Sequence, residues 1–163
     1  VYVPKFDYIQ GRIQSFFDRE TGTHNFQSDK AIDSITSGGF FGKGIGEGTL
    51  KNRVPEAHTD YIISVISEEF GVVAIMLILL LFLIFIYMVF KKISFETNDR
   101  IKLILIGSIS LILMQATIHI GVNIRLFPTT GMTLPFLSYG GSSIISTSIL
   151  AGIILNLTKR RIN

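Results

Sequence analysis

Two carboxylates, an imidazole and a hydroxyl lie within five positions of Val54–Asp60, a stretch with the sequence VPEAHTD. Glu56, His58 and Asp60 are two residues apart, so an extended segment would turn all three to one side. A carboxylate in such a cluster can act as a general base on a hydroxyl, or can bind a divalent metal with its neighbours. About ten residues later begins an apolar run long enough to cross a bilayer. Because ionisable groups are costly at a membrane boundary, we interpret the cluster as a working site.

Asp60 also has a purely structural interpretation. An aspartate is a favoured N-cap, and a helix beginning at Tyr61 would place Asp60 in that position. Lys51 and Arg53 are close enough in the sequence to favour the charged form of the carboxylate. The residues alone leave capping and catalysis equally open. A zinc hydrolase is disfavoured, because the cluster contains a single histidine.

The apolar residues that must position this cluster predict a membrane protein. Hydrophobic residues make up 48% of the chain and charged residues only 17%. Residues 71–90 carry no charge and would span about 30 Å as a helix, the thickness of a hydrocarbon core. Residues 101–122 and 138–157 are the second and third candidate spans. We therefore predict an all-α polytopic fold, in which a membrane domain of three transmembrane helices, residues 71–163, follows a large outer loop with short helices, residues 1–70.

The charges predict how the chain crosses the membrane. Residues 1–70 contain seven Lys or Arg and ten Asp or Glu, whereas residues 71–163 contain eight basic and two acidic residues. Most of the latter basic residues lie in residues 91–100 and in the C-terminal tail, which the positive-inside rule places in the cytoplasm. Residues 1–70 and 123–137 are then outside. The basic residues form no stripe with interleaved aromatics, so a nucleic-acid partner is not expected.

The outer loop contains two predicted short helices and a glycine run. Residues 7–17 have the spacing of an amphipathic helix, and residues 26–37 predict another, with Ser28 as its N-cap. Residues 38–48 contain six glycines, too many for a helix or strand interior. The run fits neither nucleotide-binding glycine pattern. It is either an anion-binding loop, with Lys43 as its cation, or a mobile hinge.

Five stretches of the sequence together resemble a known family. In order they read SGGFFGKG (residues 37–44), VPEAHTD (54–60), SEEFG (67–71), FPTTGMTLPF (127–136) and LSYGGSS (137–143). This set is similar to the carboxy-terminal part of the SEDS family (shape, elongation, division and sporulation proteins), and closer to its FtsW than to its RodA members. The resemblance implies that the chain is a fragment, made of the large outer loop and the last three helices of a longer protein.

The resemblance also implies a function: a peptidoglycan glycosyltransferase of the bacterial inner membrane that polymerises lipid II during cell division. Its partners would be a class B penicillin-binding protein and other divisome proteins. The family's essential aspartate falls on Asp60, which would activate the 4-hydroxyl of the acceptor sugar, directly or through a divalent cation such as Mg²⁺ or Mn²⁺. We expect the substrate-binding residues to be Glu56, His58, Thr59, Lys43, Lys51, Arg53, Pro128, Ser138, Tyr139, Gly140, Gly141 and Ser142.

Two other functions remain open. The polar residues Gln115 and His119 within a span would suit a flippase for lipid II, and a non-catalytic division scaffold is the third hypothesis. Three positions depart from the family pattern, since His119 stands where Asn is usual, Arg125 where Gly is usual, and Thr130 where many members have Lys. We expect these departures to be lineage variation that leaves the mechanism intact.

Overall fold

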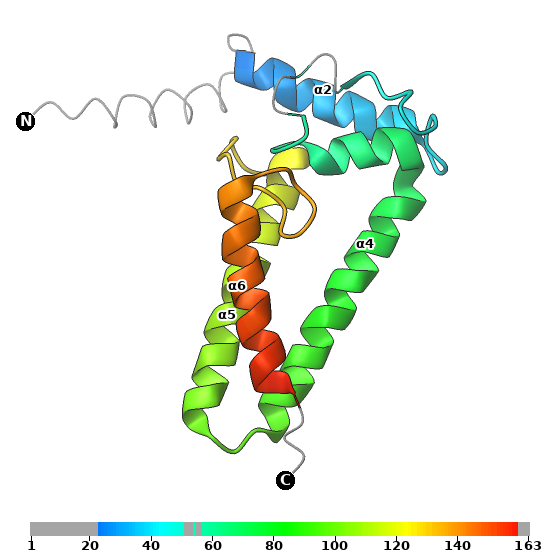
Figure 1. The fold of residues 1–163 in the computed structure, drawn as a ribbon. Helices are drawn as coiled ribbons and strands as arrows, with labels where there is room; N and C mark the ends of the chain where they lie inside the picture. Colours follow the sequence, from blue (N-terminus) through cyan, green and yellow to red (C-terminus); the bar gives the residue numbers. More distant parts are fainter. Residues whose placement is uncertain (1–22, 51–53, 55–56, 160–163) are drawn as a thin grey trace, which may run out of the picture.

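The computed structural model describes residues 23–50, 54 and 57–159. Within these ranges all regular secondary structure is helical, as predicted (Figure 1). The helices are α2 (Thr23–Gly38), α4 (Ile62–Phe95), α5 (Asp99–Asn123) and α6 (Gly141–Thr158). The short helix predicted over residues 7–17 lies outside the described residues.

Three of these helices, α4, α5 and α6, are long and apolar enough to cross a membrane, with mean hydropathies of 3.3, 2.0 and 1.5. They contain most of the three predicted spans, so the prediction of a multi-pass membrane protein is confirmed. The third span starts three residues later than predicted, at Gly141. Its expected first residues, Ser138 and Tyr139, instead form hydrogen bonds with the stretch before α4.

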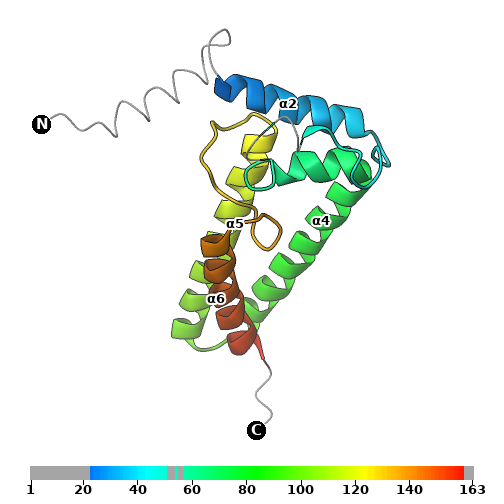
Figure 2. The same cartoon turned by 45° about the horizontal axis from the view of Figure 1, so that its top comes forward.

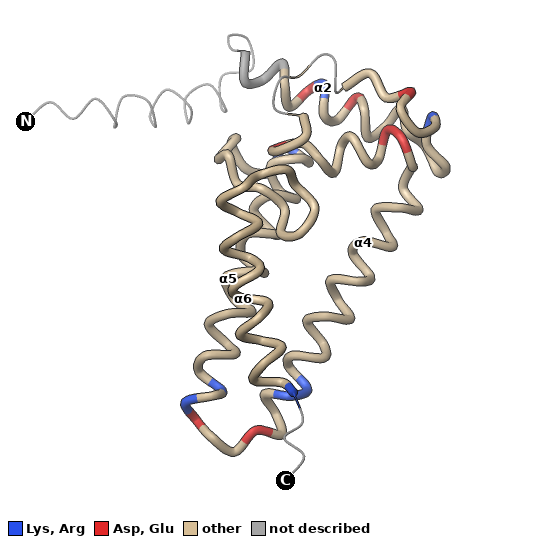
Figure 3. Tube along the Cα trace, in the orientation of Figure 1, with Lys and Arg blue, Asp and Glu red and all other residues tan. Residues whose placement is uncertain are grey.

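The spans are packed through apolar side chains, and their charges lie at the ends. Helices α5 and α6 lie side by side, whereas α4 meets them at one end and leans away toward the other (Figures 1 and 2). The charged residues gather at the turn between α4 and α5 and at the end covered by α2 (Figure 3). The main apolar cluster of the spans comprises Val89, Leu105, Ile109, Ile112 and Ile154.

Helix α4 has a sharp break at Gly71, whose φ of 78° and ψ of −177° are not helical. The segment before the break lies beneath α2, across the end of the bundle, and the segment after it runs along the spans (Figure 1). A separate apolar cluster holds this end together. Its buried members are Ala31, Leu50, Val54, Ala57, Tyr61, Val65 and Val122.

The glycine run supplies the hydrogen bonds that α4 loses at its break. In an unbroken helix the N–H groups of Val72 and Val73 would bond to the carbonyls of Glu68 and Glu69. Here all four groups bond to the glycine run instead, which leaves none of them orphaned in an apolar setting. The pairs are Val72 N to Gly39 O (3.0 Å), Val73 N to Phe40 O (3.3 Å), Lys43 N to Glu68 O (2.9 Å) and Gly44 N to Glu69 O (3.1 Å).

Neither of the two residues considered as a helix cap occupies the N-cap position. Helix α2 begins at Thr23, so Ser28 lies inside the helix, where its hydroxyl is 3.3 Å from that of Tyr61. The N-cap of α4 is Tyr61, because residues 57–61 form a turn before the first helical residue. Asp60 therefore does not occupy the N-cap position.

Candidate active site

The end of the Val54–Asp60 stretch is fixed through its main chain. Three consecutive carbonyl groups accept hydrogen bonds from the end of α5 and from the loop between α5 and α6. The bonds are Tyr139 N to His58 O (3.1 Å), Ser138 Oγ to Thr59 O (2.8 Å) and Asn123 Nδ2 to Asp60 O (2.9 Å). Two of the donors come from Ser138 and Tyr139, which were predicted to bind substrate, and the structure shows them bound to the Val54–Asp60 stretch.

The contacts of residues 58–60 with α5 and with the loop after it form a region that we call the junction. Asn123 lies at its centre and is not among the residues predicted from the sequence. Its side chain is fully buried, and its Nδ2 also donates to the carbonyl of His119 at 2.9 Å. Its Oδ1 accepts from the Ser64 hydroxyl at 2.8 Å and from the Ser64 N–H at 3.3 Å. The amide therefore joins α4, α5 and Asp60 with all of its hydrogen-bonding capacity engaged. The available signal was a polar residue at the very end of an apolar span.

Ser138 links the loop between α5 and α6 to the Val54–Asp60 stretch. Its side chain is 4% exposed. The hydroxyl accepts from the N–H of Leu134 at 2.8 Å while it donates to the carbonyl of Thr59. Because both bonds are internal, Ser138 positions the main chain beside Asp60.

The loop between α5 and α6 is itself held by polar side chains of α5. Gln115 Nε2 donates to the carbonyl of Thr133 at 2.9 Å and to the Ser143 hydroxyl at 3.1 Å. The His119 Nδ1 lies 2.8 Å from the carbonyl oxygen of Met132. These two α5 side chains suggested a transport function, and their contacts give them a role in shaping the loop.

The carboxylate of Asp60 lies at the edge of this loop. Asp60 is 8% exposed. A Cβ added to Gly131, whose φ is +70°, would lie 4.0 Å from its Oδ2. A carboxylate on a fixed main chain, close to a glycine that leaves room beside it, can accept a proton from a bound hydroxyl.

Two hollows meet beside this junction. One, of about 380 Å³, is lined by His58, Ile62, Leu137 and Tyr139. The other, of about 370 Å³, is wholly apolar and lies between α4 and the loop. Leu137 lines both hollows, and His58 and Tyr139 supply the polar groups in the otherwise apolar lining of the first. The apolar hollow is lined by Ile78, Leu81, Phe82, Phe85, Pro135, Phe136 and Leu137.

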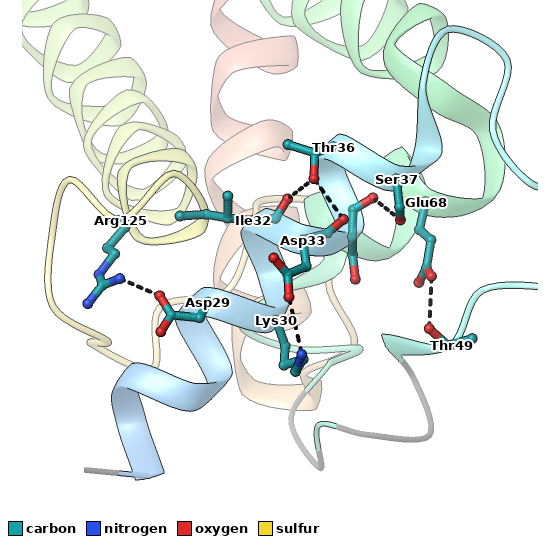
Figure 4. Close-up of polar contacts among 10 residues, drawn as sticks. Asp29, Lys30, Ile32, Asp33, Thr36, Ser37, Thr49, Glu68 and Arg125 are labelled. Atoms are coloured by element: carbon teal, nitrogen blue, oxygen red, sulfur yellow. Dashed lines mark hydrogen bonds and ion pairs between the residues drawn. The ribbon is translucent and has the colours of Figure 1, made fainter. Parts of the chain in front are cut away.

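Lys43 is engaged with a buried carboxylate. Its Nζ lies 2.9 Å from Oε1 of Glu68, a residue that is 1% exposed. The same carboxylate accepts from the Thr49 hydroxyl at 3.0 Å (Figure 4). It also accepts from the N–H of Leu50 at 3.0 Å. These bonds stabilise the charged carboxylate and favour a structural role for Lys43 over anion binding.

The remaining predicted residues are less informative. Glu56, Lys51 and Arg53 lie outside the described residues. Pro128 is half-buried in the loop, while Gly140 is the N-cap of α6 and Gly141 and Ser142 are its first residues. In the part of the chain that the structure describes, no three His, Asp or Glu side chains are grouped to hold a metal ion. A divalent cation bound by Asp60 together with His58 and Glu56 stays a prediction, because Glu56 lies outside the described residues.

Arg125 follows α5 with a φ of 59°, in the left-handed region that favours glycine. The expectation that glycine is more usual here therefore has a physical cause. The Arg125 side chain forms an ion pair with Asp29 of α2 (Figure 4). The pair joins α2 to the loop that contacts Asp60.

Comparison with known proteins agrees with this architecture. Residues 1–163 match the family model FtsW/RodA/SpoVE, described as “Cell cycle protein”. The chain belongs to the FtsW/RodA/SpoVE family. It is 39% identical over 159 residues to the “Probable peptidoglycan glycosyltransferase FtsW” of Caulobacter vibrioides, covering 96% of this chain and 40% of that protein. The Enterococcus hirae protein of the same name is 38% identical over 156 residues, covering 90% and 39%.

A solved structure is also similar to this chain. It is described as “Structural coordination of polymerization and crosslinking by a peptidoglycan synthase complex”. The TM-score is 0.70 at 28% identity, with 93% of this chain and 41% of that chain covered. The chain thus spans about two fifths of the length of its FtsW/RodA/SpoVE relatives. The resemblance to the SEDS family is confirmed.

Proposed function

We propose that the protein of which this chain is a part polymerises lipid II into glycan strands, with Asp60 as the general base. The observation that carries the proposal is the hydrogen-bonded fixing of residues 58–60 near a wholly apolar hollow, which shares Leu137 with a second hollow lined in part by His58 and Tyr139. An apolar hollow of this kind suits the lipid part of a lipid-linked sugar. The peptidoglycan glycosyltransferase name of the FtsW relatives supports the reaction class.

In this proposal the Asp60 carboxylate removes the proton from the 4-hydroxyl of the acceptor sugar as that oxygen attacks the anomeric carbon of the donor. A new glycosidic bond forms, and the bond from the anomeric carbon to the pyrophosphate oxygen breaks. Undecaprenyl pyrophosphate departs with the bonding electrons. The fixed main chain of Asp60 keeps the base in place, which lowers the entropic part of the barrier.

We place this chemistry on the outer face of the bacterial membrane. Lys91 and Lys92 lie at the end of α4 and Arg100 and Lys102 at the start of α5, whereas Asp60 precedes the start of α4. Figure 3 shows basic residues gathered at the turn between α4 and α5. The positive-inside rule then puts residues 91–100 and the C-terminus in the cytoplasm, with residues 1–70 and 123–137 outside. The cellular task is septal synthesis in cell division, with a class B penicillin-binding protein as the crosslinking partner and other divisome proteins alongside. The name FtsW and the synthase complex similar to this chain support that assignment.

The test is Asp60→Asn in the full-length protein, purified with its transpeptidase partner and given lipid II. The loss of a general base lowers such rates by roughly 10²- to 10⁴-fold. Asp33→Asn, which removes an exposed carboxylate from α2, is the matched control and should leave glycan synthesis unchanged. Undiminished glycan synthesis by Asp60→Asn would overturn the proposal and favour a scaffold.

A further inference from the structure

The glycine run carries three large apolar side chains that the described residues leave almost uncovered. Phe40 is 75% exposed, Phe41 is 86% exposed and Ile45 is 80% exposed. They lie within six positions of one another, on a loop whose backbone is bonded to α4. An apolar group of this kind on a water-facing loop is unfavourable and usually marks a contact surface.

The hydrogen bonds at the break in α4 fix the position of this loop along the length of α4. Because Val73 N donates to Phe40 O, Phe40 lies beside the first residues after Gly71. From there α4 presents exposed apolar side chains, with Val73 53% and Met76 62% exposed. Figure 1 shows the loop beside the break in α4, so its exposed apolar side chains lie next to those at the start of the spanning segment.

The loop carries two charged side chains, Lys43 and the exposed Glu47, and Lys43 is bound to α4. Lys43 lies between Phe41 and Ile45 in the sequence, yet its ammonium pairs with the buried carboxylate of Glu68. Gly42 packs tightly against α4, since a Cβ there would lie 2.2 Å from the carbonyl oxygen of Glu69. The loop is therefore anchored on its α4 side, while Phe40, Phe41 and Ile45 point outward.

We propose that Phe40, Phe41 and Ile45 insert into the interfacial region of the lipid bilayer and hold the active-site end of the molecule at a fixed depth. A lipid surface is the favoured occupant because the patch lies beside the exposed apolar side chains of a span and its three side chains are all apolar. Aromatic side chains are commonly found at this depth. The insertion does not depend on the glycosyltransferase activity.

Residues 1–163 contain no tryptophan, so an introduced tryptophan is measured as the difference between the variant and the parent full-length protein. Phe41→Trp and Ile45→Trp are prepared in the full-length protein and reconstituted into phosphatidylglycerol vesicles containing phosphatidylcholine brominated on its acyl chains. Met76→Trp, on the exposed surface of α4, is the lipid-facing control. Asp33→Trp, at an exposed charged position of α2, is the water-facing control.

We expect the brominated lipid to quench Phe41→Trp and Ile45→Trp to within about twofold of Met76→Trp, with blue-shifted emission, as for indoles at the interface. Asp33→Trp should remain unquenched and emit at longer wavelength. If both loop variants behave like Asp33→Trp, or are blue-shifted without quenching because protein covers them, the proposal is overturned. Two loop positions are used so that misfolding of one variant leaves the other to decide.

Discussion

The spans and the junction at their α2 end are held together by different forces. The spans pack through apolar side chains such as Leu105 and Ile112, whose contacts are numerous and individually weak. The junction depends on a few directional hydrogen bonds, made by Asn123, Ser138 and Glu68. Lipid is as apolar as these side chains, so we expect the spans to tolerate the replacement of one apolar side chain by another of similar size. The position of Asp60, by contrast, depends on single polar atoms, and substitutions should be most damaging there.

The largest effect on stability is expected from Gly71→Ala, at the break in α4. Gly71 has a φ of 78°, and an added Cβ would lie 2.3 Å from the carbonyl oxygen of Phe40. Backbone strain and steric overlap together should destabilise the protein by about 4 kcal/mol. Thermal unfolding in detergent, followed by circular dichroism, measures the loss.

Substitutions at two other glycines separate the contribution of backbone strain from that of steric overlap. Gly39 has a φ of +59° with open space around its Cβ position, so Gly39→Ala should cost only about 1 kcal/mol. Gly107 lies within α5 with no atom near its Cβ position, so Gly107→Ala should be neutral or stabilising by up to about 1 kcal/mol. Equal losses at Gly71 and Gly107 would show that the junction is no more demanding than the spans.

The next effect is expected from Asn123→Ala. It leaves the carbonyl of Asp60 and the hydroxyl of Ser64 without their partner, which should cost about 2–3 kcal/mol. If Asn123 positions the proposed base, kcat for lipid II polymerisation should fall by roughly 10- to 100-fold with a smaller change in KM.

Asn98 provides the control at the opposite end of α5. Its side chain accepts a hydrogen bond from the N–H of Arg100 at 3.0 Å and caps the helix. Asn98→Ala should cost about 1 kcal/mol in stability and leave kcat unchanged. A similar kcat for the Asn123 and Asn98 variants would contradict a positioning role for Asn123.

The same contrast explains which features the sequence could predict. Long uncharged runs were sufficient to predict the spans, because crossing a bilayer requires a certain length and composition. The sequence also singled out Asp60 and its neighbours. The roles of Asn123 and Ser138 could not be predicted, because their partners lie 63 and 79 residues away. The third span was predicted three residues too early because Ser138 and Tyr139 bond to the stretch before α4, a tertiary contact with no local signal.

Glu68→Gln should have an intermediate effect. The substitution keeps the shape of the side chain but removes the charge that pairs with Lys43. A buried carboxylate with three hydrogen-bond donors is replaced by a neutral amide, at a cost of about 2 kcal/mol. Lys43→Met should cost less, about 1 kcal/mol, because the Lys43 side chain is 37% exposed. The double variant should be less destabilised than the sum of the two, and strict additivity would mean that the pair does not interact.

The smallest effect is expected at Arg125, where two opposing terms nearly cancel. Arg125→Gly removes the ion pair with Asp29, in which Asp29 is 53% exposed, and so loses at most about 1 kcal/mol. It also relieves the cost of a φ of 59° in a non-glycine residue, about 1 kcal/mol. Arg125→Ala loses the pair and keeps the strain, so it should be less stable than Arg125→Gly by about 1 kcal/mol. Equal melting temperatures for the two variants would mean that residue 125 leaves the left-handed conformation once the arginine side chain is removed. The ion pair with Asp29, rather than the path of the chain after α5, would then impose that conformation.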